Sequence, residues 1–389
     1  MISVDEALSH LFTLVAPLPG ETVPLIEASG RILAAPVEAR RDQPPFAASA
    51  MDGYAIKAAE ADVHAQFKVI GESAAGHGFA GTLKPGQAVR IFTGAPVPEG
   101  ADHVAIQEDV ERRGDLITLM APQNTGNIRP RGNDFRIGDG ISAPRVLSPE
   151  DIALLAAMNV AEVTVARRPV VALISTGDEL VMPGETPGPD QIIASNTFGL
   201  FAMLLGLGAA PRLLPIARDN SESLQTAFRL AEGADLVVTI GGASVGDHDI
   251  VGDVAAALGM ERAFYKIAMR PGKPLMAGRM GDAVMVGLPG NPVSAMVCGR
   301  VFLAPMIRAM QGLEAKRTPA LTAPLARPLG ANGPREHYQR ARVENGAITV
   351  FDRQDSALLS VLAAANALAI SPPHAEALPE GAEIAYLPL

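Results

Sequence analysis

Asp235-Leu-Val-Val-Thr-Ile-Gly-Gly-Ala-Ser-Val-Gly-Asp-His-Asp249 is the stretch of sequence that decides the fold. Its residues 236–240 form a continuous run of apolar and β-branched side chains, which is typical of a strand covered on both faces. The run ends at Gly241-Gly242, a polar turn follows, and the apolar residues of 250–258 have helical spacing. The stretch therefore predicts a strand, a glycine-rich turn and a helix, the unit from which parallel α/β sheets are built.

The same alternation extends over residues 169–311. We predict strands at 170–174, 212–216, 236–240, 262–267 and 284–287. Helices are predicted at 196–207, 221–231, 250–258 and 292–310. Strands that alternate with helices in this way indicate a three-layer α/β domain with a largely parallel sheet.

The rest of the chain predicts three further domains in an α/β multidomain protein. Residues 1–41 and 136–168 both carry helical and strand signals, and we assign them to one discontinuous N-terminal mixed helix-strand domain. Short strands separated by turns predict a small, mostly β inserted domain at 42–135. Residues 312–389 predict a C-terminal β-rich domain, with a hairpin that turns at Asn345-Gly346.

Composition narrows the class of protein. The 389 residues carry a net charge of −10, 48% of them are hydrophobic, and there is one cysteine. A chain this acidic does not favour a nucleic-acid surface, and a lone cysteine excludes a disulfide framework. The first helix is amphipathic and acidic, unlike a signal peptide. We expect a cytoplasmic protein that binds neither nucleic acid nor membrane.

Five polar turns follow the predicted strands of the α/β domain. Because the carboxyl ends of parallel strands meet at one edge of the sheet, these turns should form a ligand-binding crevice there. The turns are 175–179, 218–219, 241–249, 269–274 and 287–294.

The turns, together with Lys266 at the end of the predicted strand 262–267, supply three kinds of polar side chain. They are carboxylates (Glu179, Asp219, Asp249), cations (Lys266, Arg270, Lys273) and hydroxyls (Ser175, Thr176, Ser244, Ser294). Carboxylates that hold Mg²⁺, beside cations that neutralise phosphate oxygens, suit phosphoanhydride chemistry. The alternative is structural: Asp219 and Asp249 cap the helices that follow them, and Lys266 is a solvated strand residue.

A hydrolase is a rival hypothesis. Gly242-Ala-Ser-Val-Gly246 fits the GxSxG nucleophile elbow, with Ser244 as the nucleophile, and it follows a strand. An elbow places its helix directly after the serine, whereas Gly246-Asp-His-Asp249 intervenes here. The most suitable base, His337, lies in a different predicted domain. Both points disfavour this interpretation.

Seven ordered motifs carry a resemblance that covers the whole chain. They are Ser49-Ala-Met-Asp-Gly-Tyr-Ala55, Phe92-Thr-Gly-Ala-Pro-Val-Pro98, Asn127-Ile-Arg-Pro-Arg-Gly-Asn-Asp134, Ser175-Thr-Gly-Asp-Glu-Leu180, Gly241-Gly-Ala-Ser-Val-Gly-Asp-His-Asp249, Arg270-Pro-Gly-Lys-Pro274 and Leu288-Pro-Gly-Asn-Pro292. In these motifs and their order, the sequence resembles the molybdopterin molybdenumtransferase family.

The resemblance implies a reaction and an assembly. Members of this family take adenylylated molybdopterin and molybdate, use Mg²⁺, release AMP and leave molybdenum on the dithiolene sulfurs. They are homodimers of four-domain subunits. The resemblance also implies two kinds of partner, the molybdopterin adenylyltransferase and the molybdoenzyme apoproteins.

Site residues follow from the same resemblance. Glu179, Asp219 and Asp249 would line the nucleotide and metal side, and the Gly241-Gly242 turn would cradle the AMP phosphate. Lys266, Arg270 and Lys273 would face the anionic groups, while Arg335 and Ser356 would belong to the molybdate pocket. The other subunit would supply Asp52, Thr93 and Asp134 to a composite site. Further substrate-binding residues implied by the matching motifs are Ser175, Thr176, Ser244, Pro289 and Pro292.

Three departures from the family pattern affect the expected contacts. Ala47-Ala48 stands where many relatives have Asp-Asn, and Asn133 stands where a Glu is common. Arg270 replaces a lysine, which keeps the charge and changes the donor geometry. Animal relatives also act as scaffolds at receptors, so a non-catalytic carrier or scaffold stays an alternative, as does a paralogue specialised for tungstate.

Overall fold

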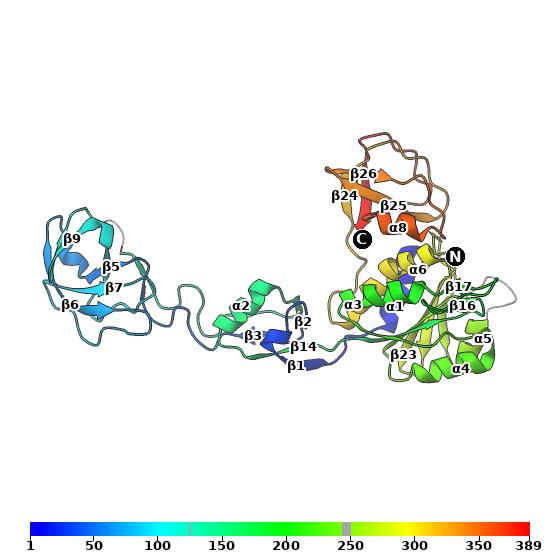
Figure 1. Ribbon diagram of the computed structural model, residues 1–389, viewed down its shortest axis with the longest axis horizontal. Coiled ribbons are helices and arrows are strands. Elements are labelled where there is room, and N and C mark those ends of the chain that lie inside the picture. Colours follow the sequence, from blue (N-terminus) through cyan, green and yellow to red (C-terminus); the bar gives the residue numbers. More distant parts are fainter. Residues whose placement is uncertain (124–125, 243–249) are drawn as a thin grey trace. The chain divides into compact units, whose positions relative to one another are not determined.

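The computed structural model describes residues 1–123, 126–242 and 250–389. The chain forms two compact units (Figure 1). One comprises Met1–Glu21 and Val165–Leu389, and the other comprises Thr22–Thr164. The finer division into four domains stays a prediction.

A six-stranded sheet forms the centre of the first unit, with the strand order β18-β15-β19-β23-β22-β20. The first four strands run parallel, and β22 and β20 each lie antiparallel to their neighbour. This confirms the largely parallel sheet. The bounds are β15 (Val170–Ser175), β18 (Ala210–Leu213), β19 (Leu236–Ile240), β20 (Glu261–Phe264), β22 (Met276–Met280) and β23 (Ala283–Leu288).

Side chains alternate between two cores on the two faces of this sheet. In β19, Val238 belongs to one core and Val237 to the other. Helices α4 (Ser221–Leu230) and α5 (Ile250–Ala257) cover one face, while α3 (Asn196–Gly206) and the helical segment 292–310 cover the opposite face (Figure 1). The three layers explain why strands 170–175 and 236–240 are apolar on both sides.

Helix α1 (Val4–Leu14) packs its buried side, including Leu8 and Leu11, into the core that contains α3. The first 21 residues therefore cluster with the α/β unit. The sequence pattern predicts that all of 1–41 belongs to the N-terminal domain, but the apolar stripe of α1 packs on the face of the α/β sheet instead.

The segment Pro292–Met310 is 19 residues long and apolar enough, by length and composition alone, to cross a membrane. Within its most apolar window, 83% of the residues are buried inside the protein. It consists of α6 (Pro292–Cys298), a π-helical turn η4 (Gly299–Leu303) and α7 (Ala304–Met310). Because the segment is mostly buried, its apolar composition is that of a core helix.

A second sheet in this unit has the order β21-β25-β27-β28-β24, with β26 paired to β25. Residues Asn345 and Gly346 both have positive φ at the β25–β26 turn, as the predicted hairpin requires. β21, which belongs to a turn of the α/β sheet, pairs in parallel with β25. The bounds are β21 (Met269–Arg270), β24 (Leu321–Pro324), β25 (Glu336–Glu344), β26 (Ala347–Val350), α8 (Leu359–Ala364), β27 (Ala367–Ser371) and β28 (Glu383–Pro388).

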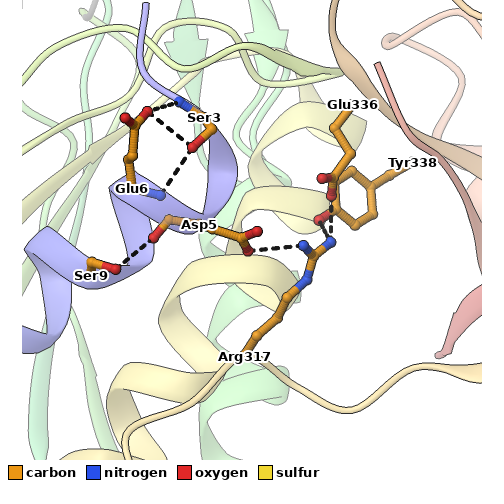
Figure 2. Close-up of polar contacts among 7 residues, drawn as sticks. All are labelled: Ser3, Asp5, Glu6, Ser9, Arg317, Glu336 and Tyr338. Atoms are coloured by element: carbon orange, nitrogen blue, oxygen red, sulfur yellow. Dashed lines mark hydrogen bonds and ion pairs between the residues drawn. The ribbon is translucent and has the colours of Figure 1, made fainter. Parts of the chain in front are cut away.

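Arg317 links α1 to β25 (Figure 2). Its guanidinium donates to Asp5 Oδ1 at 3.0 Å, to the Tyr338 hydroxyl at 2.7 Å and to the Glu336 carboxylate. The start of α1 is fixed by a capping box between Ser3 and Glu6. One side chain thus connects three segments that are distant in the sequence.

The second unit is built mainly on a six-stranded sheet with the order β8-β5-β7-β6-β10-β9. Two apolar clusters, one containing Tyr54 and one containing Ala55, show that both faces of this sheet are covered. Its strands are β5 (Gly53–Ile56), β6 (Gln66–Ser73), β7 (Gln87–Ile91), β8 (His103–Ile106), β9 (Val110–Arg113) and β10 (Leu116–Leu119).

Smaller elements complete the chain. A four-stranded sheet has the order β1-β14-β2-β13, and helix α2 (Pro149–Ala157) follows β13. The remaining bounds are β1 (Gly20–Pro24), β2 (Ile32–Leu33), β3 (Val37–Glu38), β4 (Ala48–Ser49), β11 (Ile128–Arg129), β12 (Gly140–Ile141), β13 (Arg145–Val146), β14 (Glu162–Ala166), β16 (Leu180–Val181), β17 (Ile192–Ile193), and the 3-10 turns η1 (Leu25–Glu27), η2 (Ala58–Glu60) and η3 (Gln107–Asp109).

Candidate functional site

A cavity of about 650 Å³ opens at the carboxyl ends of β15, β19 and β23. The register of the parallel strands places Ser175 beside Ile240, and Ile240 beside Leu288. The turns that follow these strands therefore share one edge of the sheet, as the sequence predicts. The volume lies in the range of small-molecule sites. The predicted residues that line the cavity are Ser175, Thr176, Glu179, Gly241, Gly242, Pro289 and Pro292.

The two-glycine turn after β19 packs against β15 at backbone distance. Gly241 and Gly242 have φ values of +97° and +64°, a region that favours glycine. A Cβ on Gly241 would lie 2.6 Å from the carbonyl oxygen of Thr176, and a Cβ on Gly242 would lie 2.4 Å from Val251 Cγ2. Only glycine fits at both positions. Because there are no side chains here, the backbone N–H and C=O groups of the turn are not covered by them at the cavity wall.

Two helices begin at the cavity. Ser195 and Asn196 at the start of α3, and Asn291 and Pro292 at the start of α6, line its wall. Neither N-cap residue, Ser195 or Asn291, caps its helix with a side-chain hydrogen bond. Helix N-termini present backbone N–H groups and the positive end of the helix dipole, so this wall suits an anion such as a phosphate.

One wall of the cavity was missed by the sequence analysis. It comes from Leu180 and from residues 192–196, where β16 and β17 pair in parallel. Asn196 also donates from Nδ2 to the carbonyl oxygen of Gly290 at 2.7 Å, which ties α3 to the turn before α6. The available signal was the Ser195-Asn196 pair, a polar start to an apolar helix.

The predicted carboxylates that the structure describes do not all lie at the cavity. Glu179 lines the cavity, whereas Asp219 is exposed and lies outside the lining. Asp219 and Asp178 exchange hydrogen bonds: Asp178 N donates to Asp219 Oδ2 at 3.4 Å, and Asp219 N donates to Asp178 Oδ1 at 3.2 Å. Asp249 and Ser244 lie outside the described residues. Within the described residues, no three His, Cys, Asp or Glu side chains group as a metal site.

The capping alternative for Asp219 is wrong. The helix α4 is capped by Asn220, whose side chain accepts from Ser223 N at 2.9 Å. The Asp219 carboxylate instead faces the turn after β15. Its position leaves it available to hold a cation beside that turn.

The predicted cations lie on the segment that follows β20. Lys266 is half-buried with its Nζ over the Tyr265 ring, 5.4 Å from the centroid, so it is not simply solvated. Arg270 and Lys273 are exposed. None of the three is among the cavity-lining residues, but Pro274, which follows Lys273, is. The segment that carries these charges therefore reaches the cavity lining only at Pro274 among the residues described.

Arg335 and Ser356 come from the second sheet and its loops. β25 pairs with β21 so that His337 lies opposite Arg270, two residues after Arg335. The Ser356 carbonyl oxygen accepts from Val293 N at 3.1 Å in the first turn of α6, and Ala357 lines the cavity. Ser356 therefore lies at the edge of the cavity, next to the lining residue Ala357.

The imidazole of His337 is held neutral. Burial lowers its pKa to about 4, helped by the positive charges of Arg270, Arg340 and Arg335. Its Nε2 is buried and has no hydrogen-bond partner among the described residues. His337 therefore lies in a group of arginines that disfavours its protonated form. Ser244, the serine of the rival hydrolase hypothesis, lies outside the described residues, so that pairing stays untested.

Asp52, Thr93 and Asp134 belong to the second unit. Asp52 Oδ1 accepts from Thr93 N at 2.7 Å and from Thr93 Oγ1 at 2.8 Å. These two bonds, the backbone one first, lower the pKa of Asp52 below its ordinary value. Asp134 is exposed, and its backbone N donates to the carbonyl oxygen of Gln43 at 2.9 Å. The structure brings Asp52 and Thr93 together.

Three family descriptions match consecutive parts of the chain. The MoeA N-terminal region (domain I and II) matches residues 2–159. The probable molybdopterin binding domain matches residues 172–309, which include the cavity turns after β15, β19 and β23. The MoeA C-terminal region (domain IV) matches residues 322–389.

Solved structures share this fold. The molybdopterin biosynthesis MoeA protein of Pyrococcus horikoshii has a TM-score of 0.87 and 30% identity, over 99% of this chain and 98% of that chain. A molybdenum cofactor biosynthesis protein of Pyrococcus furiosus has a TM-score of 0.62 at 18% identity over 100% of both chains, a likeness of fold alone.

Curated relatives are similar in sequence to this chain over most of their length. The chain is 37% identical over 356 residues to the molybdopterin molybdenumtransferase of Nostoc sp. (strain PCC 7120), covering 87% of this chain and 81% of the relative. It is 35% identical over 389 residues to molybdopterin molybdenumtransferase 2 of Mycobacterium tuberculosis, covering 95% of each. The chain therefore belongs to the molybdopterin molybdenumtransferase family.

Proposed function

We propose that this family member transfers molybdate onto the dithiolene of adenylylated molybdopterin, releases AMP and yields molybdenum cofactor. Membership makes the chain a transferase of molybdenum cofactor biosynthesis that acts on molybdopterin. The observation that carries the proposal is the cavity, where a two-glycine turn and two helix N-termini without side-chain caps meet at one sheet edge.

The AMP part of the substrate would bind in this cavity. Bare backbone groups at Gly241-Gly242 and the N-termini of α3 and α6 favour the negative charge of its phosphate. Ser175 and Thr176 supply hydroxyls, and Pro289 and Pro292 form part of the wall. These groups orient the phosphoanhydride for cleavage.

Mg²⁺ fits the donor chemistry of the turns. Asp219 lies beside the turn after β15, Glu179 from that turn lines the cavity, and Asp249 follows the glycine turn in sequence. Carboxylate oxygens are the protein ligands that Mg²⁺ prefers. We assign Asp219 and Asp249 as its ligands. When bound, the ion would neutralise charge that develops on the phosphate oxygens.

Positive residues would bring the molybdate dianion to the site. Lys266, Arg270 and Lys273 would face the anionic groups, while Arg335 and the Ser356 hydroxyl would belong to the molybdate pocket. Their support is the β21–β25 pairing and the contact between Ser356 and α6. Opposite charges raise the local concentration of a dianion.

A homodimer with a composite site completes the proposal. Asp52, Thr93 and Asp134 of one copy would act on the cavity of the other. The ionised Asp52, held by Thr93, is a preorganised carboxylate for this role. We place the protein in the cytoplasm, where the adenylyltransferase would supply its substrate and molybdoenzyme apoproteins would receive the product.

A direct assay tests the proposal. The purified protein is incubated with adenylylated molybdopterin, Mg²⁺ and molybdate, AMP is followed by chromatography, and the product is added to a molybdenum-free apoenzyme. Molybdate-dependent AMP release with activation of the apoenzyme is expected. Binding without release would contradict catalysis and favour a carrier or scaffold. Absence of binding would contradict both.

A further inference from the structure

The side chain of Arg90, on β7, donates hydrogen bonds to two residues that adjoin Asp52. Its Nη1 donates to the Gly53 carbonyl oxygen at 3.0 Å, and its Nη2 donates to Gln107 Oε1 at 2.7 Å. Gln107 in turn donates from its backbone N to the Asp52 carbonyl oxygen at 3.0 Å. One guanidinium thus holds the residue that follows Asp52 in sequence and the residue that is hydrogen-bonded to its backbone.

Two aromatic rings lie close to the same guanidinium. Its central carbon is 5.1 Å from the centroid of the Tyr54 ring and 4.8 Å from the centroid of the Phe92 ring. Tyr54 lies opposite Arg90 in the β5–β7 pairing, and Phe92 directly precedes Thr93. A guanidinium is attracted to aromatic faces while its edge donates hydrogen bonds in a fixed fork, a combination that a lysine ammonium lacks.

The two segments that Arg90 contacts meet at one carboxylate. Asp52 Oδ1 accepts from the backbone N and from Oγ1 of Thr93. These two bonds lower the pKa of Asp52, burial opposes them, and the nearby charge of Arg90 lowers it further. Within residues 1–123, 126–242 and 250–389, no ion pair joins Arg90 to Asp52. Arg90 therefore acts on the carboxylate chiefly by fixing the chain around it.

The backbone of β8 confines the turn from another direction. A Cβ on Gly53 would lie 1.9 Å from the Ala105 carbonyl oxygen, so β8 packs directly against the turn. β5 pairs with β7 on one edge and with β8 on the other. The Asp52-Gly53 backbone is thus held by strand pairing on both edges and by the Arg90 side chain.

We propose that Arg90 is a positioning residue of the composite site, which holds the Asp52 carboxylate and the Thr93 hydroxyl in the geometry that the reaction needs. The proposal rests on the proposed function, in which these two groups act on the cavity of the partner subunit. Arg90 lies outside the seven motifs that carry the family resemblance. A displacement of about 1 Å in a reacting group can cost roughly 100-fold in rate, so loss of this support should be measurable.

The experiment compares Arg90→Lys and Arg90→Met with Arg113→Met in the full-length protein. Lysine keeps the charge without the fork, and methionine removes both. Arg113 lies on β9 of the same sheet, is exposed and pairs only with Glu111 among the contacts described. We expect kcat for AMP release to fall about 10-fold or more in both Arg90 variants, with KM changed less than about twofold. Arg113→Met should keep both constants.

Mixed dimers distinguish a positioning role from general structural damage. Arg90→Met chains mixed with Asp249→Ala chains should regain up to about a quarter of the activity, because each heterodimer has one site with both parts intact. Arg90→Met chains mixed with Asp52→Ala chains should regain none, since both changes affect the same unit. Recovery in the second mixture would overturn the proposal.

Hydrogen exchange gives a measurement that does not depend on activity. The Thr93 amide, which donates to Asp52, should exchange about 10-fold faster or more in both Arg90 variants, while the amides of β10 keep their rates. The proposal is overturned if Arg90→Lys has the kcat of the unchanged protein, or if its Thr93 amide exchanges at the unchanged rate.

A second variant covers the case in which neither Arg90 variant folds. Gln107→Ala removes one acceptor of the guanidinium at an exposed position. It should also lower kcat and speed exchange of the Thr93 amide. If Gln107→Ala equals the unchanged protein in both measurements, the proposal is overturned.

AMP release separates this inference from the proposed function. If the unchanged protein and both Arg90 variants release AMP equally well, the positioning role fails while the function stands. If the unchanged protein releases no AMP, the function fails, and exchange of the Thr93 amide alone decides whether Arg90 holds this pair.

Discussion

Gly241 is the single residue where an added methyl group should affect the cavity most. Gly241→Ala would place its Cβ 2.6 Å from the Thr176 carbonyl oxygen, in addition to the strain of a φ of +97°. We expect a loss of about 2 kcal/mol or more in unfolding free energy and at least a tenfold weaker affinity for AMP. Calorimetric titration with AMP and denaturant unfolding measure both.

Gly259→Ala is the matched control. Gly259 has a similar φ of +88°, but nothing lies within 4 Å of its added Cβ. This variant should lose about 1 kcal/mol from backbone strain and keep its affinity for AMP. An equal loss of affinity in both variants would show that the close approach of Gly241 to β15 has no role in binding.

Which polar residues lie at the strand ends could be predicted from the sequence. Which side chains contact one another, and which are left without a partner, could not. Ser175, Glu179 and Gly241 could be placed at the cavity because each belongs to a turn predicted at the end of an apolar strand. Arg340 gave no such signal: it is 0% exposed, and its Nε and Nη1 have no hydrogen-bond partner within residues 1–123, 126–242 and 250–389. Burial of that kind depends on how β25 packs, which local patterns do not specify.

At the scale of elements, the N-terminal end of α2 is stabilised by one buried carboxylate, that of Asp151. Asp151 is 4% exposed and accepts from Arg145 Nε and from Ser148 N, each at 3.0 Å. Burial alone would raise its pKa, but the bonds from Arg145 and Ser148 outweigh burial and lower it. Asp151→Asn should destabilise α2 by about 1–2 kcal/mol at pH 7, measured by hydrogen exchange of the α2 amides.

The pH dependence of that effect has a definite sign. A folded pKa below the unfolded value of about 3.9 gives stability that is present above pH 3.9 and lost as the pH falls through the folded pKa. The difference between Asp151→Asn and the unchanged protein should therefore shrink only at acid pH. The control is Glu162→Gln, at an exposed position in the same region. A difference independent of pH would contradict the ion-pair explanation.

Arg317 is the element-scale link between α1 and β25 (Figure 2). Its side chain is 31% exposed and contacts Asp5, Glu336 and Tyr338. Arg317→Met should destabilise the unit by about 1–2 kcal/mol and speed hydrogen exchange in β25, because it leaves the half-buried Glu336 without its partner. Calorimetry and exchange mass spectrometry are the measurements.

Lys316→Met is the control for that link. Lys316 pairs only with the exposed Glu314 among the contacts described, and such surface pairs contribute little. We expect its melting temperature to stay within about 1 °C of the unchanged protein, consistent with a small free-energy change. If Arg317→Met behaves like Lys316→Met, the link does not stabilise β25.

Element prediction succeeded where the apolar pattern was strong. Residues 236–240 form β19 as predicted, since an apolar run between polar turns has few alternatives. β22, with the sequence Met-Ala-Gly-Arg-Met, was missed because its glycine and arginine weaken the strand pattern. The wall from β16 and β17 was missed because two-residue strands leave no periodic signal.

At the scale of the whole molecule, the composite site makes a prediction about mixed dimers. The residues assigned to the partner's site lie in Thr22–Thr164, and the cavity lies in the other unit. Asp52→Ala and Asp249→Ala chains should each be inactive alone. Their mixture should regain up to about a quarter of the activity, because random pairing gives half heterodimers with one intact site each.

Two measurements complete that test. Size-exclusion chromatography with light scattering should show the same dimer for the unchanged protein and for both variants. Mixing two batches of the same variant should give no recovery of AMP release. Failure of the two different variants to complement, with exchange of subunits demonstrated, would show that each site is built from one chain.

The most direct test of the account is an experimental structure of the full-length protein with AMP, Mg²⁺ and tungstate, which matches molybdate closely in size and charge. The account predicts AMP density against Gly241-Gly242 and the start of α3. An anomalous tungsten peak is also expected within hydrogen-bonding range of Arg335 and the Ser356 hydroxyl. AMP bound away from the carboxyl ends of β15, β19 and β23 would contradict the account.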